Sequence, residues 1–459
     1  MDSQALYDKF RMRFDNGEWK LGQRIPSIRQ VVTSEGASHH TVVKLYERLV
    51  AEGYIEAQQG RGYFVTRSGS DGSAVTVPFS SSMEMSSDPL FRLLQGHPDA
   101  LKLGCGWLPT KWRDTDILTR SIRRTARLER RSLVEYGDIQ GYRPLRLQLC
   151  QHLNNKIRLH VSPMQILTTL GATQALDLVT RLLIKPGDVV LVDEPGNGNL
   201  IKLINMAGGK VIGVPRGLDG PDVAELGRLA EQHRIRAFYC NSTFHNPTGG
   251  CVSARMAFDV LRLAIELDLM IVEDDVYGDF ASGPHQSFAE LDGLERVIYI
   301  VSFSKSLSAS LRIGYLACNL NLIAALLELK LLTSVAVPGF CERFVNTIMT
   351  DGSYLKHMHS IQRKLMVQQE VTQQALRDLG WRFEIEPVGG MFLWVRHPLM
   401  DDLNPFIQRL ADRNVLLMPG SSFSVTRGSD ECLRVNVSHF SPELVPRSEE
   451  RRVGKECVP

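Results

Sequence analysis

The sequence has no long apolar run, no paired-cysteine motif and no strong net charge, and each absence excludes a class of protein. No stretch of about 18 apolar residues occurs, and the first residues, MDSQALYDKFRMRF, lack the basic-then-apolar order of a signal peptide. We therefore expect a cytoplasmic protein without a membrane span. The eight cysteines form no C-x-x-C pair, which predicts reduced thiols and no disulfide framework or metal site. A formal net charge of +2 over 459 residues argues against polyanion binding by the chain as a whole.

Composition divides the chain into four segments. Residues 1–67 are rich in helix signals, and residues 68–88 are dominated by Ser and Gly, which is typical of a flexible linker. In residues 89–446, apolar runs such as VVLVDE, MIVEDD and VIYIVS alternate with amphipathic helical stretches. This alternation predicts an α/β domain with a mainly parallel sheet covered on both faces. In residues 447–459 the charge rises abruptly and no amphipathic helix follows. We interpret them as an artefactual tail that replaces the natural C-terminus.

The N-terminal segment carries start and stop signals for two helices. Pro26 and Ser27 are suited to the start of a helix, since proline is tolerated in the first turn and serine can cap the free amides. Gly36 ends this helix, and Ser38 caps the next one. The apolar stripe of the second helix, at i, i+3, i+4 and i+7, consists of Val42, Leu45, Tyr46 and Leu49.

The stripe leaves polar residues near the N-terminal end of the second helix, where a recognition helix contacts base edges: His39, His40, Thr41 and Lys44. Residues 54–65 follow as two short strands joined through Gly60-Arg61-Gly62, which predicts a wing. A small helical domain that binds protein is the alternative. Net charge does not decide between the two, because residues 1–67 hold ten Lys and Arg against eight Asp and Glu.

The order of these parts resembles the winged helix-turn-helix of the GntR family of bacterial regulators. R-I-P-S-x-R opens the first of the two helices, S-x-x-T-V opens the recognition helix, and G-R-G-Y-F-V closes the wing. The resemblance implies binding to double-stranded DNA. His39 stands where the family often has arginine. The residues implied in contacts with phosphates or bases are Arg24, Ser27, Arg29, His39, His40, Thr41, Lys44, Arg61 and Gly62.

Lys305 lies among small hydroxyl residues, in VSFSKSLSASLRIGYL. A lysine is protonated at neutral pH and needs help to act as a nucleophile, and condensation with pyridoxal phosphate is one way to use it. Such a cofactor needs a phosphate cradle, a carboxylate on its ring nitrogen and donors to its phenolic oxygen. The strand–glycine–helix pattern ILTTLGATQALDLV offers the amides of Ala172 and Thr173 for the phosphate. Ser302, Ser304 and Arg312 around the lysine suit the same group.

Polar residues also follow two other predicted strands. Asn246, in HNPTG, is placed to donate to the phenolic oxygen. Three consecutive acids end the run LMIVEDD, and acids facing a crevice repel one another unless a cation sits there. We predict that Asp274 pairs with the protonated ring nitrogen and that Tyr277 turns toward the phenolic oxygen. Taken singly, each signal has an ordinary alternative: a plain turn, a solvated acidic loop or a surface lysine.

From about residue 100 to 440 the chain resembles a fold-type I aminotransferase. The motifs G-A-T-Q-A-L, H-N-P-T-G, E-D-D-x-Y, S-F-S-K-S-L-x-x-x-L-R-I-G-Y and L-R-V-N-V-S stand in the family's order. The resemblance implies a large mainly parallel sheet domain, a small C-terminal α+β domain, and an internal aldimine at Lys305. It also implies that Arg434 binds the α-carboxylate of an amino compound and that Tyr136 reaches the phosphate of the neighbouring subunit in a dimer. One departure is Asn197, which stands where the family usually stacks an aromatic ring on the cofactor.

The two halves together resemble the MocR subgroup of GntR regulators. This resemblance implies a transcriptional regulator in which an amino compound displaces Lys305 from the aldimine and thereby changes how a dimer binds DNA. A working aminotransferase with an accessory DNA-binding module is the alternative, because the groups for proton transfer are present. A scaffold that binds neither ligand is a third. The sequence does not identify the effector, the operator or the sign of regulation.

Overall fold

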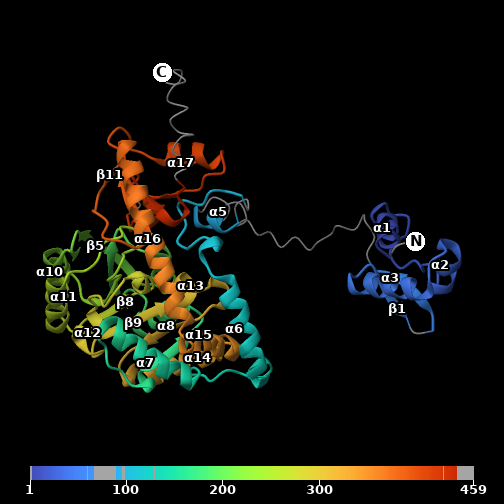
Figure 1. Cartoon of the computed structure of the whole chain (residues 1–459), viewed down its shortest axis with the longest axis horizontal. Coiled ribbons are helices and arrows are strands. Elements are labelled where there is room, and N and C mark those ends of the chain that lie inside the picture. The colour runs from blue at the N-terminus through green and yellow to red at the C-terminus, as the bar shows by residue number, and fades with distance from the viewer. Residues whose placement is uncertain are drawn as a thin grey trace. The chain divides into compact units, whose positions relative to one another are not determined.

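In a computed structural model, the chain forms two compact units, Met1–Met85 and Ser86–Pro459 (Figure 1). The structure describes residues 3–58, 60–66, 89–95, 99–128, 130–426 and 428–441. The expected linker, residues 68–88, and the expected tail, residues 447–459, lie outside the described residues. No helix in the described part of the chain is both long and apolar enough to cross a membrane.

The N-terminal unit is a helix-turn-helix followed by a two-stranded antiparallel sheet, as predicted. Ser27 accepts a hydrogen bond from the amide of Gln30 and so caps the second helix, which ends at Gly36 with φ 60°. Ser38 caps the third helix in the same way. The elements are α1 (Ser3–Asp15), α2 (Ile28–Glu35), α3 (His39–Ala51), β1 (Ile55–Gln58) and β2 (Gly62–Val65).

The small core of this unit explains the orientation of α3. All four residues of the predicted stripe on α3 are buried, and they pack with Phe10, Phe14 and Trp19. The Phe14 and Trp19 ring centroids lie 4.6 Å apart. Because the apolar stripe faces this core, the opposite side of α3 with His39 and Lys44 is exposed to solvent.

The larger unit is built on an eight-stranded sheet with the order β3-β10-β9-β8-β7-β4-β5-β6. Neighbours from β9 to β5 pair in parallel, whereas β10 is antiparallel to both of its neighbours and β6 is antiparallel to β5. The expected mainly parallel sheet is therefore confirmed, with antiparallel strands among its outer members. The strands are β3 (Ile166–Thr169), β4 (Val189–Glu194), β5 (Lys210–Gly217), β6 (Gly220–Pro221), β7 (Ile235–Cys240), β8 (Met270–Asp274), β9 (Val297–Ser302) and β10 (Gly314–Ala317).

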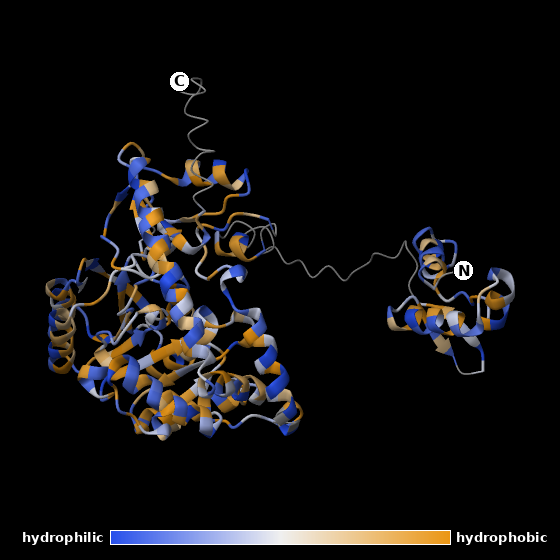
Figure 2. Ribbon diagram, in the orientation of Figure 1, coloured by the Kyte–Doolittle hydropathy of each residue, from blue (hydrophilic) through white to orange (hydrophobic). Residues whose placement is uncertain are grey.

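Helices cover both faces of this sheet. Along β4, Leu191 packs into one apolar cluster while Val190 and Val192 pack into another, so each face of the strand has its own core. Figure 2 shows the strands as mostly hydrophobic ribbons among helices of mixed hydropathy. The helices of this unit up to the C-terminal lobe are α5 (Pro89–Gln95), α6 (Thr115–Leu128), α7 (Arg143–Ile157), α8 (Ala172–Leu183), α9 (Gly198–Met206), α10 (Val223–Gln232), α11 (Ala254–Glu266), α12 (Phe288–Asp292), α13 (Phe303–Ser306), α14 (Leu320–Ser334) and α15 (Gly339–Thr350).

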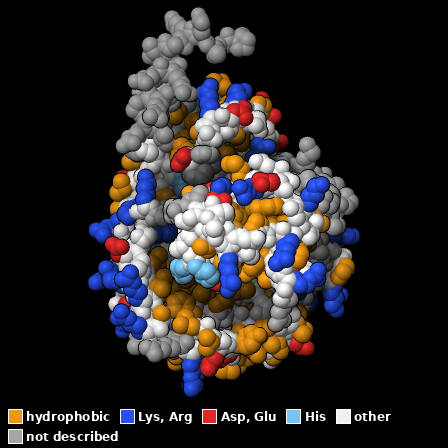
Figure 3. All heavy atoms as spheres, turned by 90° about the vertical axis from the view of Figure 1, so that its right-hand side faces the viewer, with side chains coloured by type: hydrophobic (Ala, Val, Ile, Leu, Met, Phe, Trp, Pro, Cys, Tyr) orange, Lys and Arg blue, Asp and Glu red, His pale blue; other side chains and the backbone are white. Residues whose placement is uncertain are grey.

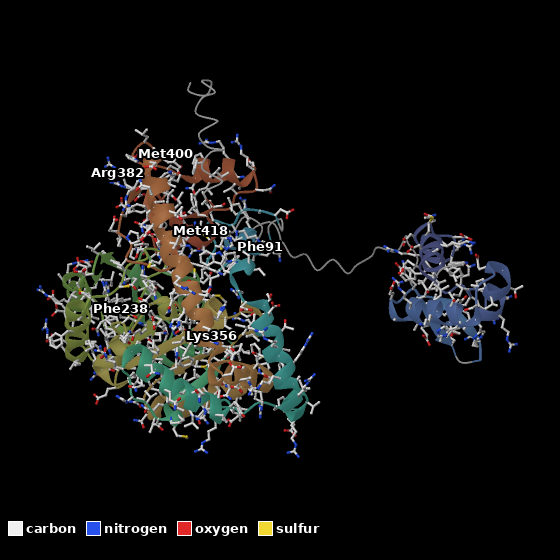
Figure 4. The ribbon with its side chains drawn as sticks, in the orientation of Figure 1. Phe91, Phe238, Lys356, Arg382, Met400 and Met418 are labelled. Atoms are coloured by element: carbon white, nitrogen blue, oxygen red, sulfur yellow. The ribbon has the colours of Figure 1, made fainter. Side chains whose placement is uncertain are left out.

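A smaller α+β lobe follows, as predicted. Its antiparallel sheet has the order β11-β12-β14-β13. Helix α5 packs on β13, and Figure 4 labels Phe91 of α5 and Met418 of β13. The elements are β11 (Arg382–Phe383), β12 (Phe392–Arg396), α17 (Asn404–Ala411), β13 (Met418–Pro419) and β14 (Cys432–Asn436).

One long helix, α16 (Ser353–Asp378), joins the lobe to the large sheet domain. Near its N-terminus, the Tyr354 hydroxyl hydrogen-bonds Oγ of Ser306 at 3.0 Å, and Nε2 of His357 lies 3.0 Å from the Ser306 carbonyl. Further along, Gln369 donates to the carbonyls of Gly389 and Gly390, just before β12. The same helix therefore contacts the turn that carries Lys305 and the sheet that carries Arg434.

Candidate functional site

Three neighbouring parallel strands deliver polar residues to one edge of the large sheet. Asn241 directly follows β7, Asp274 ends β8 and Ser302 ends β9. Ser302 also caps the one-turn helix α13, on which Lys305 sits. Because carboxyl ends of parallel strands meet at the same edge, these residues come together, as ligand-binding groups do in open α/β sheets.

Lys305 has a more reactive amine than an ordinary lysine. Burial lowers its pKa to about 8, and the nearby Arg434 guanidinium acts in the same direction. At pH 7 about one amine in ten is then neutral, whereas an ordinary lysine is almost fully protonated. This neutral amine fraction would be available as a nucleophile at physiological pH.

Gly106 marks the point where three functional side chains meet. A Cβ atom placed on Gly106 would lie 3.7 Å from Nζ of Lys305, 3.7 Å from Nη2 of Arg434 and 3.7 Å from the hydroxyl of Tyr277. The three groups come from α13, β14 and the segment after β8. Gly106 could not be predicted from the sequence, since a glycine in the loop LGCGW carries no chemical signal of its own.

Asp274, which we predicted to pair with the ring nitrogen, lines a cavity beside the strand ends. Burial raises the pKa of Asp274 to about 7, and its Oδ1 accepts a hydrogen bond from the amide of Val276 at 3.2 Å. A positive charge in the cavity would keep this carboxyl ionised. The other lining residues are Leu176, Val192, Asp193, Gly196, Asn197, Leu200, Tyr239, Cys240, Asn241, His245, Asn246 and Val272.

Only one of the three consecutive acids lines this cavity, which corrects the expectation that two or three share the crevice. Alternate side chains of a strand point to opposite faces. Glu273 accepts hydrogen bonds from the Ser287 hydroxyl at 2.8 Å and from the amides of Phe288 and Ala289, so it caps α12. Asp275 pairs with the buried Lys156 at 3.0 Å.

The turn between β3 and α8 has the features of a corner that could bind an anion. Gly171 has φ 77°, and no side chain caps the first turn of α8, where Ala172 and Thr173 lie. Nη1 of Arg312 lies 3.3 Å from Oγ of Ser304, and Nη2 donates to the Leu170 carbonyl at 2.9 Å. Among the described residues, Arg312 has no acidic partner. Helix amides, hydroxyls and an unpaired guanidinium together suit a phosphate.

Arg434 is almost fully buried and also lacks an acidic partner in the part of the chain that the structure describes. Its Nη1 donates to Oδ1 of Asn246 at 2.5 Å and its Nη2 to the Gly104 carbonyl at 2.6 Å, while its Nε has no hydrogen-bond partner. Its guanidinium lies 4.6 Å from the Phe392 ring centroid and 4.7 Å from that of Phe423. Burial lowers the pKa of Arg434 to about 10. An incoming carboxylate would supply the missing acceptor.

A supporting hydrogen-bond network surrounds Asn241, which no sequence motif singles out. Nδ2 of Asn241 donates to the Asp274 carbonyl, and its Oδ1 accepts from the amide of Asn246 at 2.8 Å. The backbone amide of Asn241 in turn donates a hydrogen bond to Oδ2 of Asp193 at 2.9 Å. Asp193 itself forms an ion pair with Arg216 at 3.0 Å. The position of Asn241 directly after an apolar strand was the available signal.

Two predicted residues have settings that differ from the central group. Tyr136 is 88 % exposed and therefore does not join the cluster in its own chain, which is consistent with a residue that serves a neighbouring subunit. Asn197 lines the same cavity as Asp274, and its side chain caps α9 by accepting from the amide of Asn199 at 3.2 Å. The place of the usual aromatic ring is thus taken by a helix cap.

Six of the nine predicted DNA-contact residues are exposed on the N-terminal unit, and the other three, Ser27, Thr41 and Gly62, are half-buried. Ser27 and Thr41 are half-buried, and each is engaged at a helix start: Oγ of Ser27 lies 2.9 Å from Oε1 of Gln30, and Oγ1 of Thr41 lies 2.8 Å from Oγ of Ser38. Arg24 lies against the wing, since a Cβ on Gly62 would stand 3.0 Å from its Nε. The exposed members are Arg24, Arg29, His39, His40, Lys44 and Arg61.

Comparisons with known proteins match both units. Residues 98–449 match the family of class I and II aminotransferases, and residues 2–65 match the gntR family of bacterial regulatory proteins. An uncharacterized HTH-type transcriptional regulator of Bacillus subtilis, YisV, is 28% identical over 444 residues, covering 93% of this chain and 90% of the relative. The probable rhizopine catabolism regulatory protein MocR of Rhizobium meliloti is 26% identical over 379 residues, covering 80% and 76%.

The larger unit also resembles solved structures. The alpha-aminoadipate aminotransferase LysN of Thermus thermophilus, complexed with N-(5'-phosphopyridoxyl)-L-leucine, superposes with a TM-score of 0.73 at 26% identity. The match covers 81% of this chain and 95% of LysN. The expected fold class is therefore confirmed.

Proposed function

The chain belongs to the class I and II aminotransferase family and carries a gntR-family regulatory domain, and on this premise we propose that it is a DNA-binding transcriptional regulator controlled by an amino compound. The observation that carries the proposal is the convergence of Lys305, Tyr277 and Arg434 around Gly106 in a chain whose other unit presents an exposed recognition helix. We place its action in the cytoplasm, where bacterial operators are.

The residues of the larger unit fit pyridoxal phosphate. The uncapped turn of α8 with Arg312, Ser302 and Ser304 would hold its phosphate, and Asp274 would hold its protonated ring nitrogen. Oδ1 of the Asn246 side chain already accepts a hydrogen bond from Arg434, so Nδ2 of the same side chain is left to donate to a phenolic oxygen. When bound, the cofactor supplies an aldehyde that bonds covalently and reversibly to amines.

Lys305 and Arg434 would then have different roles in the recognition of an amino compound. The neutral fraction of the Lys305 amine makes it the nucleophile toward the cofactor, and once released it can hold or pass on a proton. Arg434 offers an unsatisfied Nε–H to a carboxylate. An effector with an amino group and a carboxylate close together satisfies both residues.

The surface around Tyr136 supports a homodimer. Several large apolar side chains are exposed there, including Val134 at 85 % and Leu332 at 76 %. These side chains lie on one surface, because the chain segment around Tyr136 contacts the segment around Leu332. Nζ of Lys330 donates a hydrogen bond to the Ile139 carbonyl, and a Cβ on Gly137 would lie 2.3 Å from the Val337 carbonyl. A second copy covers such a patch and brings Tyr136 to its partner's phosphate corner.

The test combines DNA binding with the visible spectrum of the purified protein. We expect cofactor absorbance that is lost in Lys305→Ala, a spectral change with a small set of amino compounds, and altered affinity for the operator in the wild type only. Absence of any sequence-selective DNA binding at physiological salt would refute the regulator.

A working transaminase remains the second candidate, because 2-aminoadipate transaminase of Thermus thermophilus is 28% identical over 332 residues. Fast multiple turnover with an ordinary amino acid and a keto acid favours the enzyme. Slow or absent turnover together with a change in operator affinity favours the regulator.

A further inference from the structure

Helix α6 of the larger unit presents a row of four arginines to solvent. Arg120, Arg123, Arg124 and Arg127 have the spacing i, i+3, i+4 and i+7, which places them on one side of the helix. All four are exposed, and together they line a shallow hollow of the surface. The row is about 10 Å long at 1.5 Å per residue.

The packing of α6 fixes the direction of this row. Ser121 and Thr125 are buried on the opposite side of the helix, and Oγ1 of Thr125 hydrogen-bonds Oγ1 of Thr347 on α15 at 3.3 Å. Because α6 packs closely on α15, it cannot rotate the arginines inward without losing these contacts.

The charges of the row are poorly balanced within the chain. In the part of the chain that the structure describes, only Arg124 has an acidic partner, Asp351 at 3.5 Å. Like charges at i, i+3 and i, i+4 disfavour a helix by a few tenths of a kcal/mol per pair. Figure 3 shows Lys and Arg side chains, in blue, at many places on the surface that faces the viewer. An external anion would relieve this repulsion.

An extended row suits an extended polyanion better than a small anion, since the guanidiniums stand side by side on an open surface. Double-stranded DNA presents about one negative charge per 1.7 Å of axis, so a 10 Å row faces several phosphates. We propose that the α6 row binds the phosphate backbone of DNA that flanks the site held by the N-terminal unit. The proposal rests on the proposed function, which brings the duplex to this chain.

The test uses the full chain and two duplexes, one just long enough for the operator and one extended on both sides by unrelated sequence. We expect the wild type to bind the extended duplex about tenfold more tightly, with a steeper loss of affinity as salt rises. Replacing Arg120 and Arg127 by Gln should remove most of this gain and reduce the salt slope by up to about 0.9 per lost phosphate contact. Affinity for the short duplex should not change.

A matched control lies on α11. Arg255 and Arg262 have the same i, i+7 spacing and are also exposed, so their replacement by Gln removes equal charge from another face and should leave the gain intact. Substitution of Arg120 and Arg127 by Lys should keep most of the gain, because lysine also binds phosphate as a point charge.

The outcomes separate this proposal from the proposed function. If the wild type gains nothing from the flanks, or if the Gln variant keeps the gain, the α6 row serves another partner, such as an acidic protein, and the proposal is wrong. Equal weakening on both duplexes means an indirect effect and also overturns it. If the wild type fails to bind even the short duplex selectively, the proposed function itself fails.

Discussion

Arg434 and Asn246 are joined by a hydrogen bond of 2.5 Å that links β14 of the C-terminal lobe to the turn after β7 of the large sheet. The residue expected to bind the effector carboxylate is therefore attached to a residue expected to touch the cofactor. A carboxylate bound at Arg434 would compete with or reorient this bond, so under the proposed function ligand binding would act directly on the contact between lobe and sheet.

The first prediction concerns this arginine. Arg434→Ala should weaken the spectral response to amino acids by at least about a hundredfold, because a buried, charge-assisted bond to a carboxylate is worth about 3 kcal/mol. Titration by absorbance measures the loss. Arg382→Ala, on the exposed edge strand β11 of the same lobe, is the control and should respond like the wild type. Normal operator affinity without effector is expected in both variants.

The second prediction concerns the phosphate corner. Gly171→Ala should lower affinity for pyridoxal phosphate about tenfold or more, because a Cβ would stand 3.0 Å from Nη2 of Arg312. Gly187→Ala is the matched control: its φ of +91° costs similar backbone strain, but no atom lies within 4 Å of the added Cβ. Both variants should lose on the order of 1–3 kcal/mol of stability, and only the first should lose cofactor affinity. A similar affinity in the two would contradict the assignment of this corner.

The third prediction concerns Asp274 and pH. Burial raises the pKa of Asp274 to about 7 from an ordinary value near 3.8. Between these values the folded protein binds the proton and the unfolded chain does not, so the stability of the cofactor-free protein falls as pH rises from about 4 to 7.

Asp274→Asn removes this penalty and should raise the melting temperature of the cofactor-free protein at pH 8. The corresponding gain in the free energy of unfolding is at most about 4 kcal/mol. At pH 4, where wild-type Asp274 is already protonated in the folded state, the gain should be small. The same variant should bind pyridoxal phosphate more weakly. Calorimetry at the two pH values and cofactor titration check the two parts, and tighter cofactor binding would refute the ring-nitrogen role.

The fourth prediction concerns the wing. Arg61 is exposed at its tip, and Arg61→Gln should weaken binding to all DNA sequences and reduce the salt slope by about 0.9, as expected for one lost phosphate contact. Lys20→Gln removes an exposed charge from the same unit and should change neither quantity. Fluorescence anisotropy over a salt series distinguishes the two, and an unchanged slope for Arg61→Gln excludes a phosphate contact there.

Local signals in the sequence predicted the N-terminal unit in detail. The caps Ser27 and Ser38, the stop at Gly36 and the buried stripe of α3 all depend on interactions within a few residues. The strands VVLVDE and VIYIVS were also predicted with their observed bounds, since continuous apolar runs are typical of strands covered on both faces.

The rest of the site depends on contacts distant in sequence. Gly106 matters because it lies beside Lys305 and Arg434, which are about 200 and 330 positions away, and no periodic pattern encodes that proximity. The three acids at the end of β8 were misjudged for a related reason. Their partners, Lys156 and the start of α12, come from other elements, so the sequence alone does not reveal which face each carboxylate takes.

The 26-residue α16 spans about 39 Å at 1.5 Å per residue. A rod of that length amplifies small rotations: pivoting by about 5° at the Ser306 end sweeps the far end through roughly 3 Å. A small tilt of α16 at its Ser306 end would therefore produce a larger displacement at the opposite end of the helix.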